Sequence, residues 1–160
     1  MAILTSMRQA AWNAIETWPA LQGVFKRKWK FEDANSILPK EIMPSIGEMP
    51  AIAIYPAPSE SPWVRNQDKE FRYVLNVEVW RAHWNLLDLE SDCEEIAKAL
   101  FQGHAGGTTV SFIKAATGQY PEVNSFNIER VLLADENKAV KLTLPVTIKY
   151  LAWNPITATS

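Results

Sequence analysis

The chain has 160 residues, of which 48% are hydrophobic and 21% are charged, and its formal net charge is −2. These values are typical of a folded domain with a sizeable core, and they exclude a disordered chain and a strongly basic nucleic-acid-binding protein. No apolar run approaches the roughly 20 residues that cross a bilayer, and the first residues lack the pattern of a secretory signal. The single cysteine, Cys93, excludes an intrachain disulfide and a cysteine-rich zinc site. We therefore expect one domain over residues 1–160, made and used in cytoplasm.

The first predicted elements are a helix and a basic segment. Residues Thr5–Trp18 place apolar side chains on one stripe at helical spacing, and Pro19 ends the helix because the residue before proline avoids helical geometry. The segment Val24–Phe31 then surrounds Trp29 with lysines and an arginine. Such residues can contact phosphates and stack on a base. In a chain of net negative charge, however, a solvated basic surface with Trp29 directed inward is the favoured interpretation.

A strand bounded by prolines and a polar loop follow. The stretch Ala34–Gly47 contains two prolines and predicts a loop. Residues Ala51–Tyr55 lie between Pro50 and Pro56 and alternate in the manner of a short strand. The polar residues Ser59–Glu70 are too many for a tight turn, so they predict an exposed loop that projects from the sheet and touches another protein.

The longest predicted strand is Phe71–His83, in which side chains alternate between two faces. The first face is apolar and belongs to the core; it carries Phe71, Tyr73, Leu75, Val77 and Val79. The second face carries Arg72, Val74, Asn76, Glu78 and Trp80. Two interpretations of Trp80 stay open, because large aromatic side chains serve cores and interfaces alike. Either it meets a neighbouring subunit with Asn76 and Glu78 beside it, or the N-terminal helix of its own chain covers it.

The last third predicts a helix and a hairpin. Residues Ser91–Gln102 carry a buried stripe and begin with a capping-box pattern, SDCE. Phe126–Leu133 and Ala139–Tyr150 form the two arms of a hairpin, and residues 151–160 form a tail. Pro145 cannot donate a ladder hydrogen bond, which indicates a bulge or a strand edge that is not fully paired. The sum is an α+β domain, with a mostly antiparallel β-sheet and helices packed on one face.

No group of residues suits catalysis or metal binding. The two histidines, His83 and His104, have no second ligand at metal-binding spacing, and no serine lies in a nucleophile-elbow motif. Cys93 lies on the apolar stripe of its helix and reads as a small core residue. The acidic run Glu90–Glu95 suits a helix N-terminus, and the glycine-rich Gly103–Gly107 lacks the lysine of a phosphate loop. We expect no enzymatic activity, no cofactor and no bound metal.

The order of the elements resembles that of the tail terminator, or tail completion, proteins of long-tailed bacteriophages. The resemblance covers Thr5–Tyr150: an amphipathic helix, the strand "PAIAIYP" with its polar loop, the strand "FRYVLNVEVW", the helix "LESDCEEIAKALF" and the hairpin "FNIERVLLADENKAVKLTLPVTIKYL". The stretch Gly103–Glu122 matches no element of the family. That mismatch leaves a second interpretation, another head–tail joining protein of the neck. A small cytoplasmic enzyme and a monomeric binding module are further alternatives from other classes.

The resemblance implies a structural virion protein that is assembled in the host cytoplasm as a ring, usually of six subunits. Such a ring sits on the end of the tail tube, ends its polymerisation and joins it to the head connector. The implied partners are further copies of the chain, the tail tube protein, and a connector or neck protein. DNA is implied only as it passes through the lumen of the ring, and no membrane is implied.

Eight residues are candidates for contacts between subunits or with partners. They lie in the predicted loop, on the second face of the long strand, at the interrupted strand edge and in the tail: Trp63, Arg65, Asp68, Asn76, Glu78, Trp80, Pro145 and Trp153. A heterologous ring contact needs two different patches on each subunit, and an unpaired strand edge is one such patch. Trp153 has a competing interpretation, in which it folds back onto the sheet of its own chain.

Overall fold

The structure is a computed structural model that describes residues 3–29, 44–56, 63–65, 70–102, 121–123, 125–133 and 137–150. Among these residues the α-helices are α1 (Ile3–Thr17) and α2 (Leu86–Gln102), and short 3-10 helices lie at Pro19–Leu21 and Ile46–Glu48. The strands are β1 (Arg27–Trp29), β2 (Ala51–Pro56), β3 (Trp63–Arg65), β4 (Glu70–Ala82), β5 (Glu122–Val123), β6 (Asn127–Leu132) and β7 (Lys138–Tyr150).

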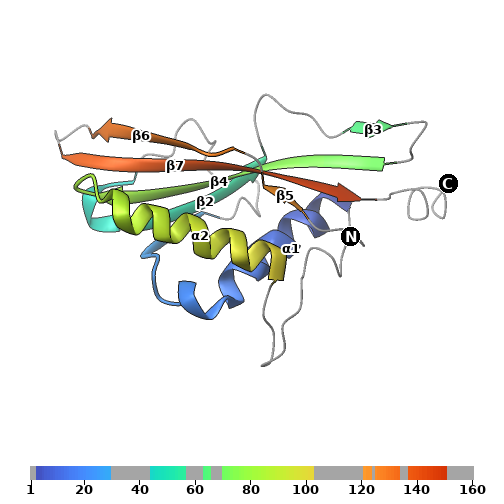
Figure 1. Cartoon of the computed structure of the whole chain (residues 1–160), viewed down its shortest axis with the longest axis horizontal. Coiled ribbons are helices and arrows are strands. Elements are labelled where there is room, and N and C mark those ends of the chain that lie inside the picture. Colours follow the sequence, from blue (N-terminus) through green and yellow to red (C-terminus); the bar gives the residue numbers. More distant parts are fainter. Residues whose placement is uncertain are drawn as a thin grey trace.

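All the strands join one sheet, in the order β1-β2-β4-β7-β5, with β3 added to β4 and β6 added to β7. Its centre is the antiparallel pair β4 and β7, which runs in register from Phe71 opposite Tyr150 to Ala82 opposite Ala139. The only parallel pair among the described strands is β1 with β2. Both α-helices pack against the same face of the sheet, and Figure 1 shows them together on one side. The expected α+β fold, a mostly antiparallel sheet with helices on one face, is confirmed.

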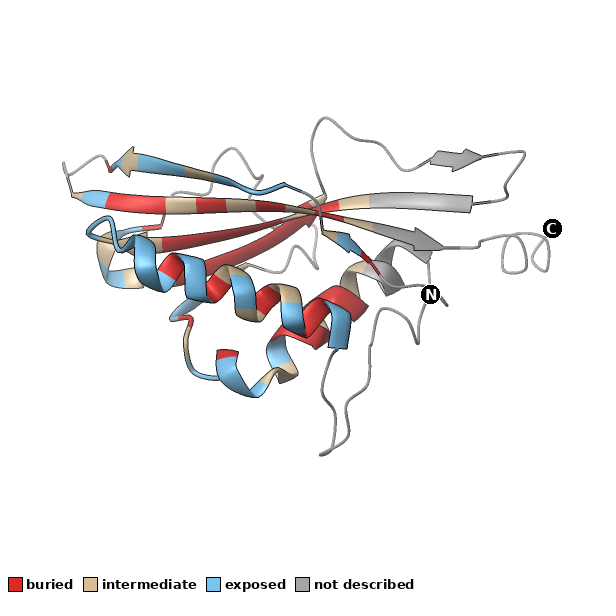
Figure 2. Cartoon of the chain, in the orientation of Figure 1, coloured by how far each residue is buried: buried red, intermediate tan, exposed pale blue. Residues whose placement is uncertain are grey.

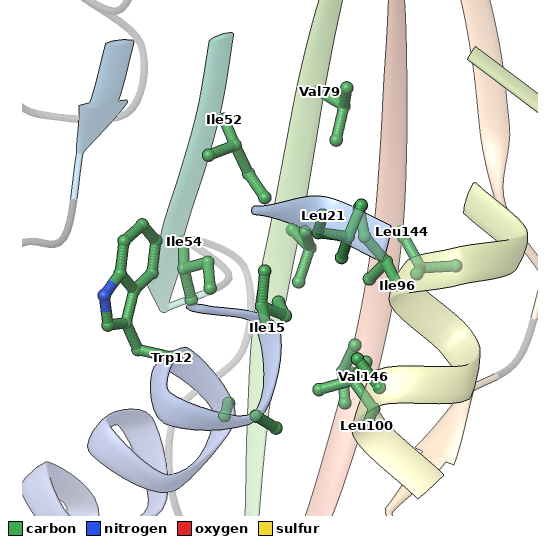
Figure 3. Close-up of a cluster of buried hydrophobic side chains, with 14 of the residues drawn as sticks. Trp12, Ile15, Leu21, Ile52, Ile54, Val79, Ile96, Leu100, Leu144 and Val146 are labelled. Carbon is green, nitrogen blue, oxygen red and sulfur yellow. The ribbon is translucent and has the colours of Figure 1, made fainter. Parts of the chain in front are cut away.

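The main core lies between the helices and this face of the sheet (Figure 3). Its helical side chains recur at the spacing of one helix face: Ala11, Ala14 and Ile15 from α1, and Leu89, Ile96, Ala99 and Leu100 from α2. The sheet contributes alternate residues of its three longest central strands: Ile52 and Ile54, then Leu75, Val77 and Val79, then Val140, Leu142, Leu144 and Val146. The apolar face that the sequence predicted for the long strand is therefore the face that the helices cover.

The helix α2 begins five residues earlier than the sequence predicted. Its N-terminus is capped by Asn85, whose side-chain oxygen accepts a hydrogen bond from the Asp88 backbone N–H at 3.2 Å. The predicted capping box at Ser91 is wrong, because Ser91 lies inside the helix. The chain reverses between β4 and α2 with two consecutive residues in left-handed geometry, His83 at φ 59° and Trp84 at φ 56°. This geometry is uncommon for residues other than glycine.

One buried ion pair connects α2 to the central strand. The Arg81 guanidinium on β4 donates two hydrogen bonds to the Asp92 carboxylate on α2, at 2.7 and 2.8 Å. The Asp92 side chain is 6% exposed and the Arg81 side chain 18%. A second carboxylate, Asp88, lies 3.7 Å from Arg81 but is 54% exposed. Hydrogen bonding to Asp92 is the main reason that the pKa of Arg81 is raised.

The first prediction concerns this ion pair. Asp92→Ala should lower the free energy of unfolding by about 3 kcal/mol, because it leaves the Arg81 guanidinium largely buried without its counter-charge. Asp88→Ala is the matched control and should cost about 1 kcal/mol or less, because an exposed charge contributes little. Urea denaturation of the two variants measures both values. Equal losses for the two substitutions would show that the buried pair has no special role.

Candidate functional site

The structure brings four of the eight candidate residues together on the sheet face opposite the helices. Asn76 pairs with Pro145 across β4 and β7, and Glu78 and Trp80 occupy the next two positions of the same face. Residues Trp63 and Arg65 lie in β3, at the far end of β4. The other two candidates, Asp68 and Trp153, lie outside the described residues.

The predicted loop Ser59–Glu70 contains a strand. Its residues Trp63–Arg65 form β3 and pair antiparallel with Glu70–Arg72 at the start of β4. Part of the segment therefore extends the sheet, where the sequence had predicted only an exposed loop. The polar composition of the segment did not indicate a strand, because a strand of three paired residues needs no long apolar run. Its contact with another protein remains a prediction.

The polar face of β4 is closed within the subunit at Glu78 and Trp80, whereas Asn76 is half-buried. Trp80 is 2% exposed, and it packs with Met49, Ala51, Leu133 and Ala139 in a second buried cluster. The alternative in which the N-terminal helix covers Trp80 is wrong, because α1 contributes to the main core on the opposite face. Figure 2 shows the buried and less buried positions alternating along β7. Contact of this face with a neighbouring subunit remains a prediction, and at Trp80 and Glu78 it would require the covering residues to move.

Glu78 and Tyr55 form a buried polar pair inside this closed face. The Tyr55 hydroxyl donates a hydrogen bond to the Glu78 carboxylate, and the two residues are 6% and 4% exposed. Burial raises the pKa of Glu78, while the Tyr55 hydroxyl and the Lys141 ammonium oppose the rise. Burial also raises the pKa of Tyr55. Lys141 forms an ion pair with Glu129 at 3.0 Å.

Small side chains make this arrangement possible. On β2 the neighbours of Trp80 and Glu78 are Ala51 and Ala53, both fully buried. Their small size leaves room for the indole of Trp80 and for the partly buried Trp29 on β1. The indole N–H groups of both tryptophans are buried without a hydrogen bond of ordinary geometry. The pair of Tyr55 and Glu78 holds an acid and a hydroxyl together, but almost no surface of either group is open to a substrate.

A second surface lies at the end of the sheet where α2 begins, and the sequence did not predict it. The Trp84 ring has two cations within cation–π distance of its centroid, Arg130 from β6 at 4.6 Å and Lys138 from β7 at 4.5 Å. Leu132, at the end of β6, is 64% exposed beside them, and Trp84 itself is 38% exposed. We call Trp84, Arg130, Leu132 and Lys138 the cationic corner. No local pattern indicates such a surface, because its cations come from strands far from Trp84 in sequence.

An open hollow of about 450 Å³ lies on the other side of the same reversal. Its described lining residues come from the segment before β2, from the end of β4 and from the reversal before α2: Met49, Pro50, Arg81, Ala82, His83 and Asn85. Its one guanidinium, that of Arg81, is already paired with Asp92. Apart from Arg81 and the exposed His83, the described lining residues carry no titratable side chain.

The titratable residues that the sequence analysis weighed as catalytic or metal-binding candidates are not grouped together. Cys93 is half-buried beside the main core, and burial raises the pKa of its thiol, which disfavours the reactive thiolate. Among the described residues, no three His, Cys, Asp or Glu side chains are grouped as a metal site. His104 and the glycine-rich Gly103–Gly107 lie outside the described residues.

No protein-family model matches the sequence, and no curated protein matches it. Within the described part of the chain, no helix has both the length and the apolar character needed to cross a membrane.

The second prediction concerns the buried carboxyl group. The folded state raises the pKa of Glu78 above the ordinary value of 4.5, so it retains a proton that the unfolded chain releases. Stability should therefore fall as the pH rises from the ordinary to the raised value. Glu78→Gln removes the charge but keeps an oxygen that accepts the Tyr55 hydrogen bond. Urea denaturation across this pH range should show that the variant lacks the fall and is the more stable protein near neutral pH.

Tyr55→Phe provides the matched comparison. It removes the donor that opposes the rise in the pKa of Glu78, so the fall in stability should become steeper than in the wild type. Parallel pH profiles for the wild type and Glu78→Gln would contradict the assignment of this dependence to Glu78.

Proposed function

We propose that the chain is a structural subunit of a bacteriophage tail. In this proposal, copies of the chain form a ring, usually of six subunits, that caps the tail tube, ends its polymerisation and joins it to the head connector. The observation that carries the proposal is the order of the elements in one sheet. An N-terminal helix, the strand β2 between two prolines, the long strand β4, the helix α2 and the final hairpin of β6 and β7 follow each other. This order resembles that of tail terminator proteins.

The arrangement of the sheet suits a ring subunit. Its two longest strands pair in register over most of their length and form a stiff centre. The outer edge of β7 is interrupted: β6 pairs as far as Thr143, and β5 pairs only from Val146. Pro145, which has no N–H to donate, lies in this interruption, as expected from the sequence. Only residues 124–126 separate β5 from β6, and the register on β7 shifts by one residue between them, which is the pattern of a β-bulge.

The proposal also fits the distribution of buried polar groups. The face of β4 with Asn76, Glu78 and Trp80 is largely closed by the subunit itself. Contacts with other subunits are therefore expected at the ends and edges of the sheet and on the outer side of the helices. The ring assigns no catalytic residue and needs no cofactor, and its partners are the tail tube protein and a connector or neck protein.

The third prediction tests the proposed function. The purified chain, alone or after addition of the tail tube protein from the same virus, should form closed rings with a central opening in negatively stained electron micrographs. Native mass spectrometry should give a single ring mass, with six subunits expected. In a tube polymerisation assay, the protein should stop elongation at low molar ratios to tube protein, because each capped end needs only one ring. A chain that stays monomeric with tube protein present and leaves tube length unchanged would contradict the proposal.

A further inference from the structure

The cationic corner carries charge that no described carboxylate neutralises. Among the described residues, the guanidinium of Arg130 and the ammonium of Lys138 have no carboxylate within ion-pair distance, and both lie against the Trp84 ring instead. Lys141, three positions after Lys138 on β7, differs from these two cations because it forms an ion pair with Glu129 at 3.0 Å. The corner thus combines two cations that have no ion-pair partner within the described residues with exposed apolar surface from Trp84 and Leu132.

The backbone holds this corner in place. The N–H of His83 donates a hydrogen bond of 2.7 Å to the carbonyl of Lys138, which ties the reversal after β4 to the first residue of β7. Leu132 lies opposite Lys138 in the pairing of β6 with β7. A tryptophan fixed in this way loses little conformational entropy on binding, and tryptophan and arginine are the residues most enriched in interface hot spots.

A surface of opposite charge lies on the outer side of α2. Starting from Leu87, the residues three, seven and fourteen positions further along α2 lie on one exposed stripe. The buried Leu89, Ile96 and Leu100 lie on the opposite side of the helix. We call this stripe the outer ridge, and it consists of Leu87, Glu90, Glu94 and Phe101. Leu87 is 78% exposed and Phe101 is 39% exposed, so the ridge has apolar side chains at both ends of its carboxylates. Figure 2 shows exposed positions along this side of the helix.

The two carboxylates of the ridge differ in their pairing. Glu94 lies 3.5 Å from Lys98, which also contacts Glu95. Within the described residues, Glu90 has no ion-pair partner. The ridge therefore offers negative charge flanked by apolar surface, and the cationic corner offers positive charge flanked by apolar surface.

We propose that the cationic corner of one copy of the chain binds the outer ridge of α2 on the next copy. The occupant is a second copy because the same chain carries both surfaces, with opposite charge and matching apolar character. The two surfaces are different, so the contact is head-to-tail, and repetition of such a contact produces a ring or a filament. The inference deepens the proposed function and rests on it for closure of the ring.

A charge-swap experiment tests this contact. Arg130→Glu with Lys138→Glu makes the corner acidic, and Glu90→Lys with Glu94→Lys makes the ridge basic. Each double variant alone should associate at least about tenfold more weakly than the wild type, because like charges then face each other across the contact. An equimolar mixture should recover assembly, since both kinds of contact between unlike variants become complementary. Sedimentation velocity measures association, and far-ultraviolet circular dichroism checks that each variant is folded.

The control reverses two exposed lysines at the opposite side of the sheet. Lys26→Glu with Lys28→Glu changes the net charge by the same amount as the corner variant and lies at β1. It should associate as the wild type does. High salt should weaken wild-type association, because ions screen exposed charges.

Three results would overturn the proposed contact. The first is wild-type association in both double variants, the second is a mixture that assembles no better than its components, and the third is a wild type that stays monomeric at about 1 mM. Failure of the proposed function looks different. If the mixture restores assembly but micrographs show open filaments or dimers, the contact stands and the terminator ring does not. If rings form with tube protein and the charge swaps have no effect, the ring stands and this contact does not.

Discussion

The pairing of β4 with β7 is the constraint on which the rest of the structure depends. The two strands are held in one register from Phe71 opposite Tyr150 to Ala82 opposite Ala139. Side chains alternate between faces, so a slip of one residue would turn Val77 and Val79 away from the helices. The same slip would place Glu78 in the apolar core. The burial of alternating side chains on β4 and β7 therefore fixes this register. The register in turn sets the positions at which β2 pairs with β4 and β6 pairs with β7.

The two faces of this ladder are stabilised by different means. Toward the helices the sheet is apolar. Among the described residues, the one buried ion pair on this face joins Arg81 to Asp92 and orients α2 against β4. On the other face, alanines at positions 51 and 53 make room for large tryptophans, and Tyr55 satisfies the buried Glu78 carboxylate. Other molecules can therefore meet the ends and edges of the sheet, the outer side of α2, and the half-buried part of the second face around Asn76 and Pro145.

Much of this fold could be predicted from the sequence, because its main signals are periodic. The alternation in β4 and β7 and the stripe of α1 gave element type and the core face directly. The start of α2 was missed, because SDCE matches a capping box while the actual cap, Asn85, follows two residues in left-handed geometry that no local pattern indicates. The strand β3 was missed because it is only three polar-flanked residues long.

The candidate contact surfaces were harder to predict than the fold. Alternation placed Asn76, Glu78 and Trp80 on one face correctly, yet it contained no information on what covers that face. Met49 and Leu133 do so, and they come from segments far from β4 in sequence. The cationic corner has the same origin, since Arg130 and Lys138 meet Trp84 only when β6 and β7 are paired. Surfaces built from distant segments depend on tertiary structure, which a single sequence read by period and motif does not supply.

The central claim is that this chain forms the ring between tail tube and head, and a cryo-electron microscopy reconstruction of the virus particle tests it most directly. The account predicts that the map at the head-proximal end of the tube contains a closed ring of copies of this sheet, with both α-helices on one face and Trp80 enclosed within each subunit. A map in which that ring is built by another fold, or in which this chain occupies no position in the tail or neck, would contradict it.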